Sequence, residues 1–357
     1  MRLVFFNEFD LFQNNSAGIT VRSLFGDEVC RESLQVVSRS KYLFVEQNGK
    51  CLIKKKRGFI SFLKMIRAIK HYNPDVLYTT GNSISALLLL SLIKITLNIP
   101  ILVHYFDNWR ETGHCSIKNF LLKVISGKKE LALVISDEMG LHYKEKYQGD
   151  YITLMVGTCN NALKISSESL KEIVFLYAGG FHLGRVDALL EIEKELQSIK
   201  SFNVILIIAT FSNDYEQFHN QFDSKITHFY VDIPHEKVDE LYKTAQVLLF
   251  VEPAPEDKMT FLKYSMSTKI PEYLSSGIPI LCYAHSDIAP TSYFKRTHSA
   301  FVVSDRKDLK TTILNICEKR NVSTIVENAK VAANRDYSIN TQRQLLYGAI
   351  DRIVINK

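Results

Sequence analysis

Residues 264–280 read Tyr-Ser-Met-Ser-Thr-Lys-Ile-Pro-Glu-Tyr-Leu-Ser-Ser-Gly-Ile-Pro-Ile, which is the most specific segment of this 357-residue chain. The order of residue types predicts a short helix with a hydroxyl cap that ends at Gly277, followed by a buried strand that opens at Pro279. The start of such a helix can hold a phosphate. Glu272 would lie about one turn further along, where its carboxylate can accept hydrogen bonds from ribose hydroxyls. The alternative is that Glu272 is an exposed residue near the helix dipole.

A second glycine-rich segment, residues 175–185, reads Phe-Leu-Tyr-Ala-Gly-Gly-Phe-His-Leu-Gly-Arg and joins a predicted strand to a predicted helix at 186–196. Glycines such as Gly180 let a backbone approach a ligand closely, and the guanidinium of Arg185 suits a pair of phosphate oxygens. Backbone amides and Arg185 could therefore converge on a phosphate. A tight turn with a solvated arginine explains the segment equally well. The spacing is not the Gly-x-Gly-x-x-Gly dinucleotide fingerprint.

Outward from these two segments, short aliphatic runs alternate with longer amphipathic ones, which is typical of parallel sheets covered by helices on both faces. The predicted strands form two series: 2–6, 34–37, 76–78, 101–106, 131–135 and 151–155, and then 173–177, 204–209, 228–231, 247–251, 279–283 and 300–303. We predict an α/β protein with two Rossmann-like domains, 1–160 and 161–335, joined by a polar linker at 157–171. Residues 336–357 are expected to form a helix that packs back on the first domain.

The length and composition of the chain limit its domain number, its cellular compartment and its relation to the membrane. The chain has room for two domains of roughly 150 residues. Six cysteines stand at long, unequal spacings without a zinc or disulfide pattern, which favours a reducing cytoplasm. The N-terminus lacks the apolar centre of a secretory signal, and Lys94, Asn98 and Pro100 interrupt the longest apolar run. We therefore expect no transmembrane segment.

Positive charge is concentrated in the first half, where residues 1–165 carry 22 basic and 14 acidic residues. Its densest part, between Cys51 and Tyr72, has no acidic residue and contains Lys54, Lys55, Lys56, Arg57, Lys64, Arg67 and Lys70. Apolar residues interleave with these cations, so the stretch from Lys54 to Lys70 is predicted to be a helix suited to an anionic membrane surface. The alternative is a sheet-covering helix with a solvated basic face. No nucleic-acid-binding motif accompanies the charge, so we expect no nucleic acid partner.

The string at 271–281, together with the Ser-Thr-Lys before it and the Ala-Gly-Gly roughly ninety residues earlier, resembles the donor half of family 4 retaining glycosyltransferases of the GT-B fold. Residues 232–242 resemble the loop and helix that precede a strand in that family. The resemblance implies that Glu272 holds a nucleotide ribose and that Arg185 contacts the diphosphate. The other donor-site residues it implies are Gly18, Gly180, Tyr264, Ser267, Thr268 and Lys269.

The N-terminal half resembles the same family at residues 16–22, 104–109 and 134–139. This part implies an acceptor-binding role for Asp107, Asn108 and Trp109, and a catalytic role for Asp107 and His104 together with Arg185. His104 lies two residues before the position of the family's histidine, at Phe106, so it either substitutes for that histidine or belongs to the core. The alternative to an acceptor-binding role for Trp109 is a purely structural one.

By resemblance, the chain moves a sugar with retention from a UDP- or GDP-linked donor to a saccharide or polyprenyl-linked acceptor, in surface polysaccharide assembly. The expected setting is the cytoplasm, peripheral to the inner face of the plasma membrane, with an active site between the domains. One alternative is a sugar-nucleotide 2-epimerase of the same architecture. The other is a catalytically silent sugar-nucleotide or glycan-binding protein, which is favoured by Tyr264 at the position of a second family glutamate.

The sequence has no Asp-x-Asp motif for a metal-bound diphosphate. Charge on the leaving group must then be met by Arg185, Lys269 and backbone dipoles, so we expect neither an essential metal nor another cofactor.

This expectation predicts that excess EDTA leaves the rate of sugar transfer nearly unchanged, because protein cations replace the metal in stabilising the leaving diphosphate. The measurement is a transfer assay in matched buffers with and without chelator. Loss of transfer that magnesium or manganese restores would contradict it.

Overall fold

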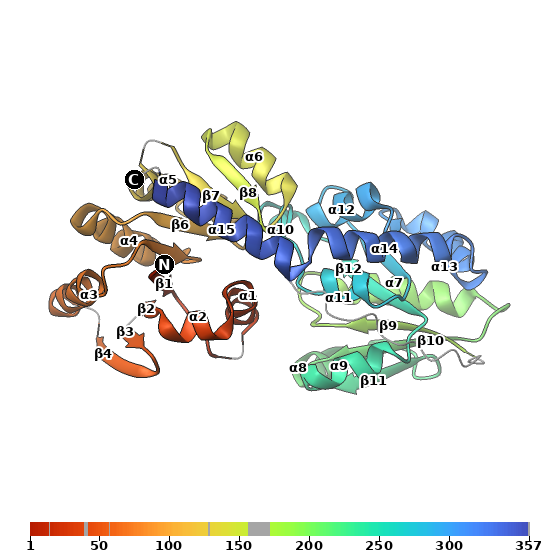
Figure 1. Cartoon of the computed structure of the whole chain (residues 1–357). Helices are drawn as coiled ribbons and strands as arrows, with labels where there is room; N and C mark the ends of the chain where they lie inside the picture. Colours follow the sequence, from red (N-terminus) through yellow and green to blue (C-terminus); the bar gives the residue numbers. More distant parts are fainter. Residues whose placement is uncertain (14, 39–41, 57, 128, 156–171, 356–357) are drawn as a thin grey trace. The chain divides into compact units, whose positions relative to one another are not determined.

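The structure is a computed structural model that describes residues 1–13, 15–38, 42–56, 58–127, 129–155 and 172–355 (Figure 1). The chain divides into two compact units. Unit 1 comprises residues 1–157, 264–266 and 339–357, and unit 2 comprises residues 158–263 and 267–338. The linker predicted at 157–171 lies outside the described residues.

Unit 1 is built on an eight-stranded sheet in the order β4-β3-β2-β1-β5-β6-β7-β8. The strands are β1 (Leu3–Asn7), β2 (Leu34–Ser38), β3 (Tyr42–Gln47), β4 (Lys50–Lys56), β5 (Val76–Thr79), β6 (Ile101–Tyr105), β7 (Leu131–Val134) and β8 (Asp150–Thr153). The helices are α1 (Ser16–Phe25), α2 (Asp27–Glu32), α3 (Phe59–Tyr72), α4 (Ile84–Leu97), α5 (Cys115–Ser126), α6 (Asp137–Tyr147) and α15 (Ile339–Ile355), with a 3-10 turn, η1, at Trp109–Glu111.

The hairpin of β3 and β4 corrects one prediction. Both strands are antiparallel to their neighbours, and Asn48 and Gly49 form the turn between them with φ of 51° and 72°. Positive φ at both positions suits Asn-Gly in a tight hairpin. Lys54 therefore lies in a strand, and the helix expected from Lys54 to Lys70 begins only at Phe59.

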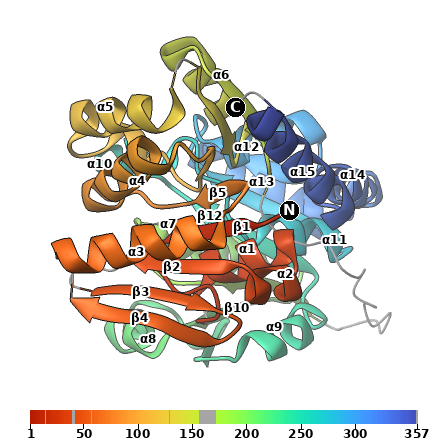
Figure 2. The same ribbon diagram turned by 60° about the vertical axis from the view of Figure 1, so that its left-hand side comes forward.

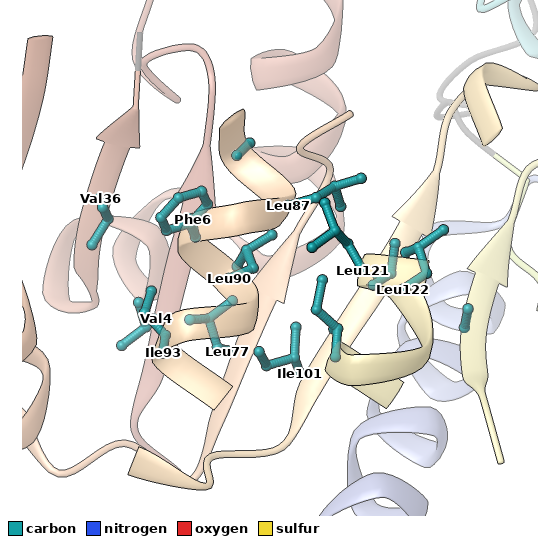
Figure 3. Packing of buried hydrophobic residues seen from close by; sticks show 14 of the residues in the cluster. Val4, Phe6, Val36, Leu77, Leu87, Leu90, Ile93, Ile101, Leu121 and Leu122 are labelled. Atoms are coloured by element: carbon teal, nitrogen blue, oxygen red, sulfur yellow. The ribbon is translucent and has the colours of Figure 1, made fainter. Parts of the chain in front are cut away.

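Helices cover both faces of this sheet. Figure 3 shows Leu87, Leu90 and Ile93 of α4 packed on Val4 and Leu77 of the sheet, in a cluster to which α3, α5 and α6 also contribute. Side chains of α1 and α15 pack in a second cluster with β1 and β5. Each fully buried aliphatic side chain contributes about 1.5–3 kcal/mol, so this burial fixes which side of each helix faces inward.

Unit 2 contains a six-stranded parallel sheet in the order β11-β10-β9-β12-β13-β14. Its strands are β9 (Ile173–Ala178), β10 (Val204–Thr210), β11 (Thr227–Val231), β12 (Val247–Glu252), β13 (Ile280–Ala284) and β14 (Phe301–Val303). Its helices are α7 (Arg185–Ser198), α8 (Ser212–Phe218), α9 (His235–Tyr242), α10 (Glu256–Leu262), α11 (Ile270–Ser275), α12 (Ala289–Thr297), α13 (Leu309–Cys317) and α14 (Val322–Asp336), with 3-10 turns η2 (His219–Gln221) and η3 (Arg306–Asp308).

The strand order of unit 2 reverses direction between β9 and β12, because β9 pairs with β10 on one side and with β12 on the other. In open α/β sheets, ligands bind at the carboxyl ends of strands near such a reversal. The prediction of two Rossmann-like sheets with a C-terminal helix is confirmed. None of the helices in the described ranges has the length and apolarity that crossing a membrane requires.

The core of unit 1 predicts a contrast between two leucines of α4. Leu90 is fully buried and Leu92 is 42% exposed, so Leu90→Ala should lower the free energy of unfolding by about 2–5 kcal/mol and Leu92→Ala by at most about 0.5 kcal/mol. The one tryptophan of the chain, Trp109, is buried in the same cluster, and its fluorescence during urea unfolding reports on this unit. Equal urea midpoints for the two variants would contradict the assigned packing.

Candidate functional site

A cavity of about 380 Å³ opens in unit 2 at the carboxyl ends of β9, β10 and β11. Its lining combines an apolar wall with a few polar groups and consists of Ala178, Gly179, Ala209, Thr210, Phe211, Asp232, Ile233, Val238, Tyr242, Thr268, Lys269 and Glu272. Small-molecule sites in proteins have this mixture and a volume of about 300–1,000 Å³. Three residues predicted from the sequence, Thr268, Lys269 and Glu272, meet in this cavity.

Glu272 lies in the first turn of α11, where its carboxylate is half-buried. The Tyr242 hydroxyl donates to Oε2 of Glu272 at 3.3 Å, which orients the carboxylate. The predicted hydroxyl cap is absent, because Lys269 occupies the position before the helix and no side chain caps it; Ser267 Oγ instead accepts a bond from the Lys269 amide at 3.3 Å. Gly277, with φ of 78°, follows the helix. A carboxylate held in this way can accept hydrogen bonds from a ligand's hydroxyl groups.

Lys269 brings its ammonium group against the backbone at Gly179. A Cβ atom at Gly179 would overlap Lys269 Nζ, and a side chain at φ of +156° would strain the backbone, so this position favours glycine. Burial and, to a smaller extent, the charge of Arg185 together lower the pKa of Lys269 to about 8, although Glu272 and Glu252 act in the opposite direction. An anion in the cavity would favour the charged form of this lysine.

Arg185 begins α7 and forms an ion pair with Glu252 at the end of β12. Its guanidinium also donates to the Gly180 carbonyl at 3.4 Å and lies 3.2 Å from His182 Nε2. Both partners of the ion pair are largely buried, which rules out the solvated arginine considered from the sequence. Arg185 is not among the residues that line the cavity, and it contacts the loop after β9 through the Gly180 carbonyl.

Asp107 follows β6 in unit 1 and remains half-buried. Ser265 Oγ donates to Asp107 Oδ1 at 2.9 Å. Burial raises the pKa of Asp107 to about 6, because it outweighs the stabilisation of the carboxylate by Ser265. At neutral pH this side chain is mainly an anionic hydrogen-bond acceptor.

His104 is fully buried within β6. Its Nδ1 lies 2.7 Å from the Tyr78 hydroxyl, and its ring packs edge-on against Phe106 at 4.5 Å. Burial lowers the pKa of His104 to about 3, so the imidazole is neutral at physiological pH. These observations favour the core interpretation of His104 over the catalytic one.

Asn108 and Trp109 are also buried. The Tyr143 hydroxyl donates to Asn108 Oδ1 at 2.8 Å, and the Trp109 ring lies 4.9 Å from that of Tyr105. Both side chains thus stabilise the end of β6, and the structural alternative is favoured for Trp109. Their acceptor role stays a prediction.

Tyr264 occupies a different place from the one expected of a donor-site residue in domain 161–335. It belongs to the core of unit 1, where its ring stacks on His142 at 4.8 Å and its carbonyl accepts a bond from Ser136 Oγ at 2.8 Å. Aromatic stacking and burial of the ring account for this placement.

Gly18 lies in α1, and its amide donates to the capping Asn15 side chain at 2.7 Å. A Cβ atom at Gly18 would lie 2.8 Å from the Leu11 carbonyl oxygen, so close packing is sufficient reason for glycine there. Gly180 similarly accepts a bond from the Tyr177 hydroxyl at 2.7 Å. The donor-binding roles of both glycines stay predictions.

Sequence reasoning missed the apolar wall of the cavity, which Phe211, Ile233 and Val238 form. Phe211 follows a strand that the sequence predicted, so the rule that ligands bind at strand ends could have found it. Within the described residues, no group of three His, Cys, Asp or Glu side chains could hold a metal ion.

No protein-family model matches the chain, and no curated protein matches its sequence. Solved structures match its fold along nearly its whole length. The HepE protein of Anabaena, solved in complex with UDP, has a TM-score of 0.71 at 12% identity, over 99% of this chain and 100% of that one.

Two further structures agree. A glycosyltransferase of Rickettsia africae has a TM-score of 0.72 at 12% identity, over 100% of this chain and 99% of the other. The α,α-trehalose-6-phosphate synthase of Burkholderia multivorans has a TM-score of 0.67 at 8% identity, over 99% of each chain. The chain therefore has the GT-B fold of these glycosyltransferases, with two Rossmann-like units and a C-terminal helix.

Proposed function

We propose that this protein is a glycosyltransferase that takes a sugar from a nucleoside diphosphate sugar linked to UDP or GDP. The observation that carries the proposal is the cavity at the strand ends of unit 2, where Glu272 and Lys269 lie together beside Gly179. Structures of the same fold support it, because HepE of Anabaena has been solved with UDP and with UDP-glucose.

The chemistry of the cavity gives each part of a nucleotide a partner. The half-buried Glu272 carboxylate accepts hydrogen bonds from ribose hydroxyls. The Lys269 ammonium meets the diphosphate, and Gly179 leaves space for it. The apolar wall with Phe211 and Val238 suits the flat face of a base.

Arg185 acts on this site through the loop after β9. Its ion pair with Glu252 joins the start of α7 to the end of β12, and its bond to the Gly180 carbonyl holds the loop after β9. We therefore assign Arg185 to positioning that loop, and we assign direct charge stabilisation of the leaving diphosphate to Lys269.

The finer parts of the proposal concern the reaction. We propose transfer of a hexose with retention and without a metal, through an oxocarbenium-like transition state, to a saccharide or polyprenyl-linked acceptor in surface polysaccharide assembly. The acceptor-side residue best placed for this role is Asp107, which is half-buried and anionic at neutral pH.

A catalytically silent nucleotide-sugar-binding protein is the second candidate. Tyr264 supplies no carboxylate at the position where a second glutamate was sought, and its ring is committed to the core of unit 1. Nucleotide binding without turnover across a panel of acceptors would favour this candidate.

The first experiment is a thermal-shift screen of the full chain against UDP, GDP and their sugars, because a ligand that binds the folded state raises its melting temperature. A rise with a nucleotide and none with free glucose supports the donor site. No rise with any of them at concentrations well above a millimolar would overturn the proposal.

The ribose contact predicts the effect of Glu272→Gln. Charge-assisted hydrogen bonds contribute roughly 1.5–3 kcal/mol, so the donor KM should rise about 10- to 150-fold with a smaller change in kcat. The matched control is Glu327→Gln, which changes an exposed carboxylate on α14. Steady-state kinetics measure both, and a parental KM in Glu272→Gln would show that the ribose lies elsewhere.

The lowered pKa of Lys269 predicts that nucleotide affinity depends on pH. The cation that attracts the diphosphate is lost as pH rises through about 8, so the Kd for UDP or GDP should increase from about pH 7 to about pH 9. Lys269→Arg should abolish this dependence, because a guanidinium stays protonated, and Lys269→Met should weaken binding most at about pH 7 and approach the parent as pH rises. Calorimetry across this range provides the test, and an unchanged pH profile in Lys269→Arg is the outcome that contradicts it.

A further inference from the structure

Three helices of unit 1 lie side by side on one face of its sheet. Figure 2 shows α3, α4 and α5 stacked in order, and their inner sides all pack in the same hydrophobic cluster. Their outer sides nevertheless carry large apolar side chains that are 37% to 76% exposed: Phe59, Ile60 and Leu63 on α3, Leu88, Leu92 and Ile95 on α4, and Ile117 and Phe120 on α5. We call these eight side chains the apolar patch.

The middle helix shows why the patch is unusual for a surface facing water. The sequence of α4 is Ile-Ser-Ala-Leu-Leu-Leu-Leu-Ser-Leu-Ile-Lys-Ile-Thr-Leu, which is apolar on every side. Leu87, Leu90 and Ile93 are buried, whereas Leu92 and Ile95 point outward. A helix that is hydrophobic all round is normally covered all round, so the outer side of α4 requires a second apolar medium.

The charges on the three helices indicate which apolar medium covers the patch. The sequences of α3, α4 and α5 contain no Asp or Glu, but they contain six basic residues: Lys64, Arg67, Lys70, Lys94, Lys118 and Lys123. Lys64, Arg67 and Lys123 are exposed beside the patch. A surface that combines protruding apolar side chains with positive charge, and lacks acidic residues, matches the interface of an anionic bilayer.

The lengths of the three helices determine whether they can span a membrane or only lie on its surface. α3 and α4 have 14 residues each and α5 has 12, which is shorter than the roughly 20 residues that a helix needs to span a bilayer. We propose that the outer sides of α3, α4 and α5 lie flat on an anionic bilayer. Phe59, Ile95 and Phe120 enter the boundary between headgroups and acyl chains, and Lys64, Arg67 and Lys123 contact lipid phosphates.

Binding to vesicles tests the proposal independently of sugar transfer. The probe is the full chain with vesicles of phosphatidylglycerol and phosphatidylcholine, compared with vesicles of phosphatidylcholine alone. The parent should bind the anionic vesicles far more tightly, and added salt should weaken this binding because it screens the charges. Ile95→Gln/Phe120→Gln should weaken binding by about tenfold or more, since it removes two inserting side chains.

Two further variants separate the contributions. Lys64→Gln/Arg67→Gln should lose about tenfold or more on anionic vesicles and should reduce the salt dependence. The control, Val331→Gln/Leu345→Gln, changes exposed apolar side chains on α14 and α15 and should bind as the parent does. Circular dichroism should be the same for all four proteins, because every substituted side chain is exposed.

Two results would overturn the proposal. One is that the parent fails to bind anionic vesicles, or that Ile95→Gln/Phe120→Gln binds them as tightly as the parent. The other is a dimer in sedimentation velocity that Ile95→Gln/Phe120→Gln abolishes, without vesicle binding by the parent. That result would assign the patch to contact between copies of the chain.

Discussion

The candidate site depends on the contact between Gly179 and the ammonium group of Lys269. A Cβ atom at Gly179 would take the space that this ammonium fills, so a larger residue there would push the Lys269 side chain aside. Burial of an ammonium group disfavours its charged form, and the neighbouring Arg185 adds repulsion. Lys269 therefore has a lowered pKa. A diphosphate beside it would reverse this balance, because it would bring negative charge to a cation that the protein itself neutralises only in part.

The ion pair of Arg185 with Glu252 explains how the loop after β9 keeps its shape. A buried charge that loses its partner costs about 3–5 kcal/mol, so the two residues hold the start of α7 and the end of β12 in a fixed relation. Since the same guanidinium bonds the Gly180 carbonyl, the pair also fixes the backbone beside Gly179. Arg185, which the resemblance assigned to the diphosphate, thus also holds the backbone beside the cavity, and its contact with a diphosphate stays a prediction.

Most of the sheet architecture could be predicted from sequence because buried parallel strands appear as short aliphatic runs. The β3–β4 hairpin was not predicted, because Lys50–Lys56 is rich in lysine and does not resemble a buried strand. Asn48 and Gly49 nevertheless carry a hairpin signal. Glu272 and Lys269 could be identified from the sequence because both belong to one local motif. The burial of Tyr264 could not be predicted, because it depends on Ser136 and His142, more than a hundred residues away in the sequence. Likewise, the core position of His104 depends on its contact with Tyr78, which only the pairing of β5 and β6 brings near.

The order of elements in unit 1 links the apolar patch to Asp107. Helix α4 leads directly into β6, and Asp107 is the second residue after that strand. Five residues of β6 at about 3.3 Å each place roughly 17 Å of strand between the end of α4 and the carboxylate. Because β6 pairs with β5 and β7 on either side, this spacing is rigid. If α4 rests flat on a bilayer, this stretch of β6 runs parallel to the membrane, and the layer of helices, about 10 Å thick, holds Asp107 at a fixed height above the lipid headgroups. A rigid height suits an acceptor saccharide whose lipid end stays in the membrane, since only its sugar end then has to reach the carboxylate.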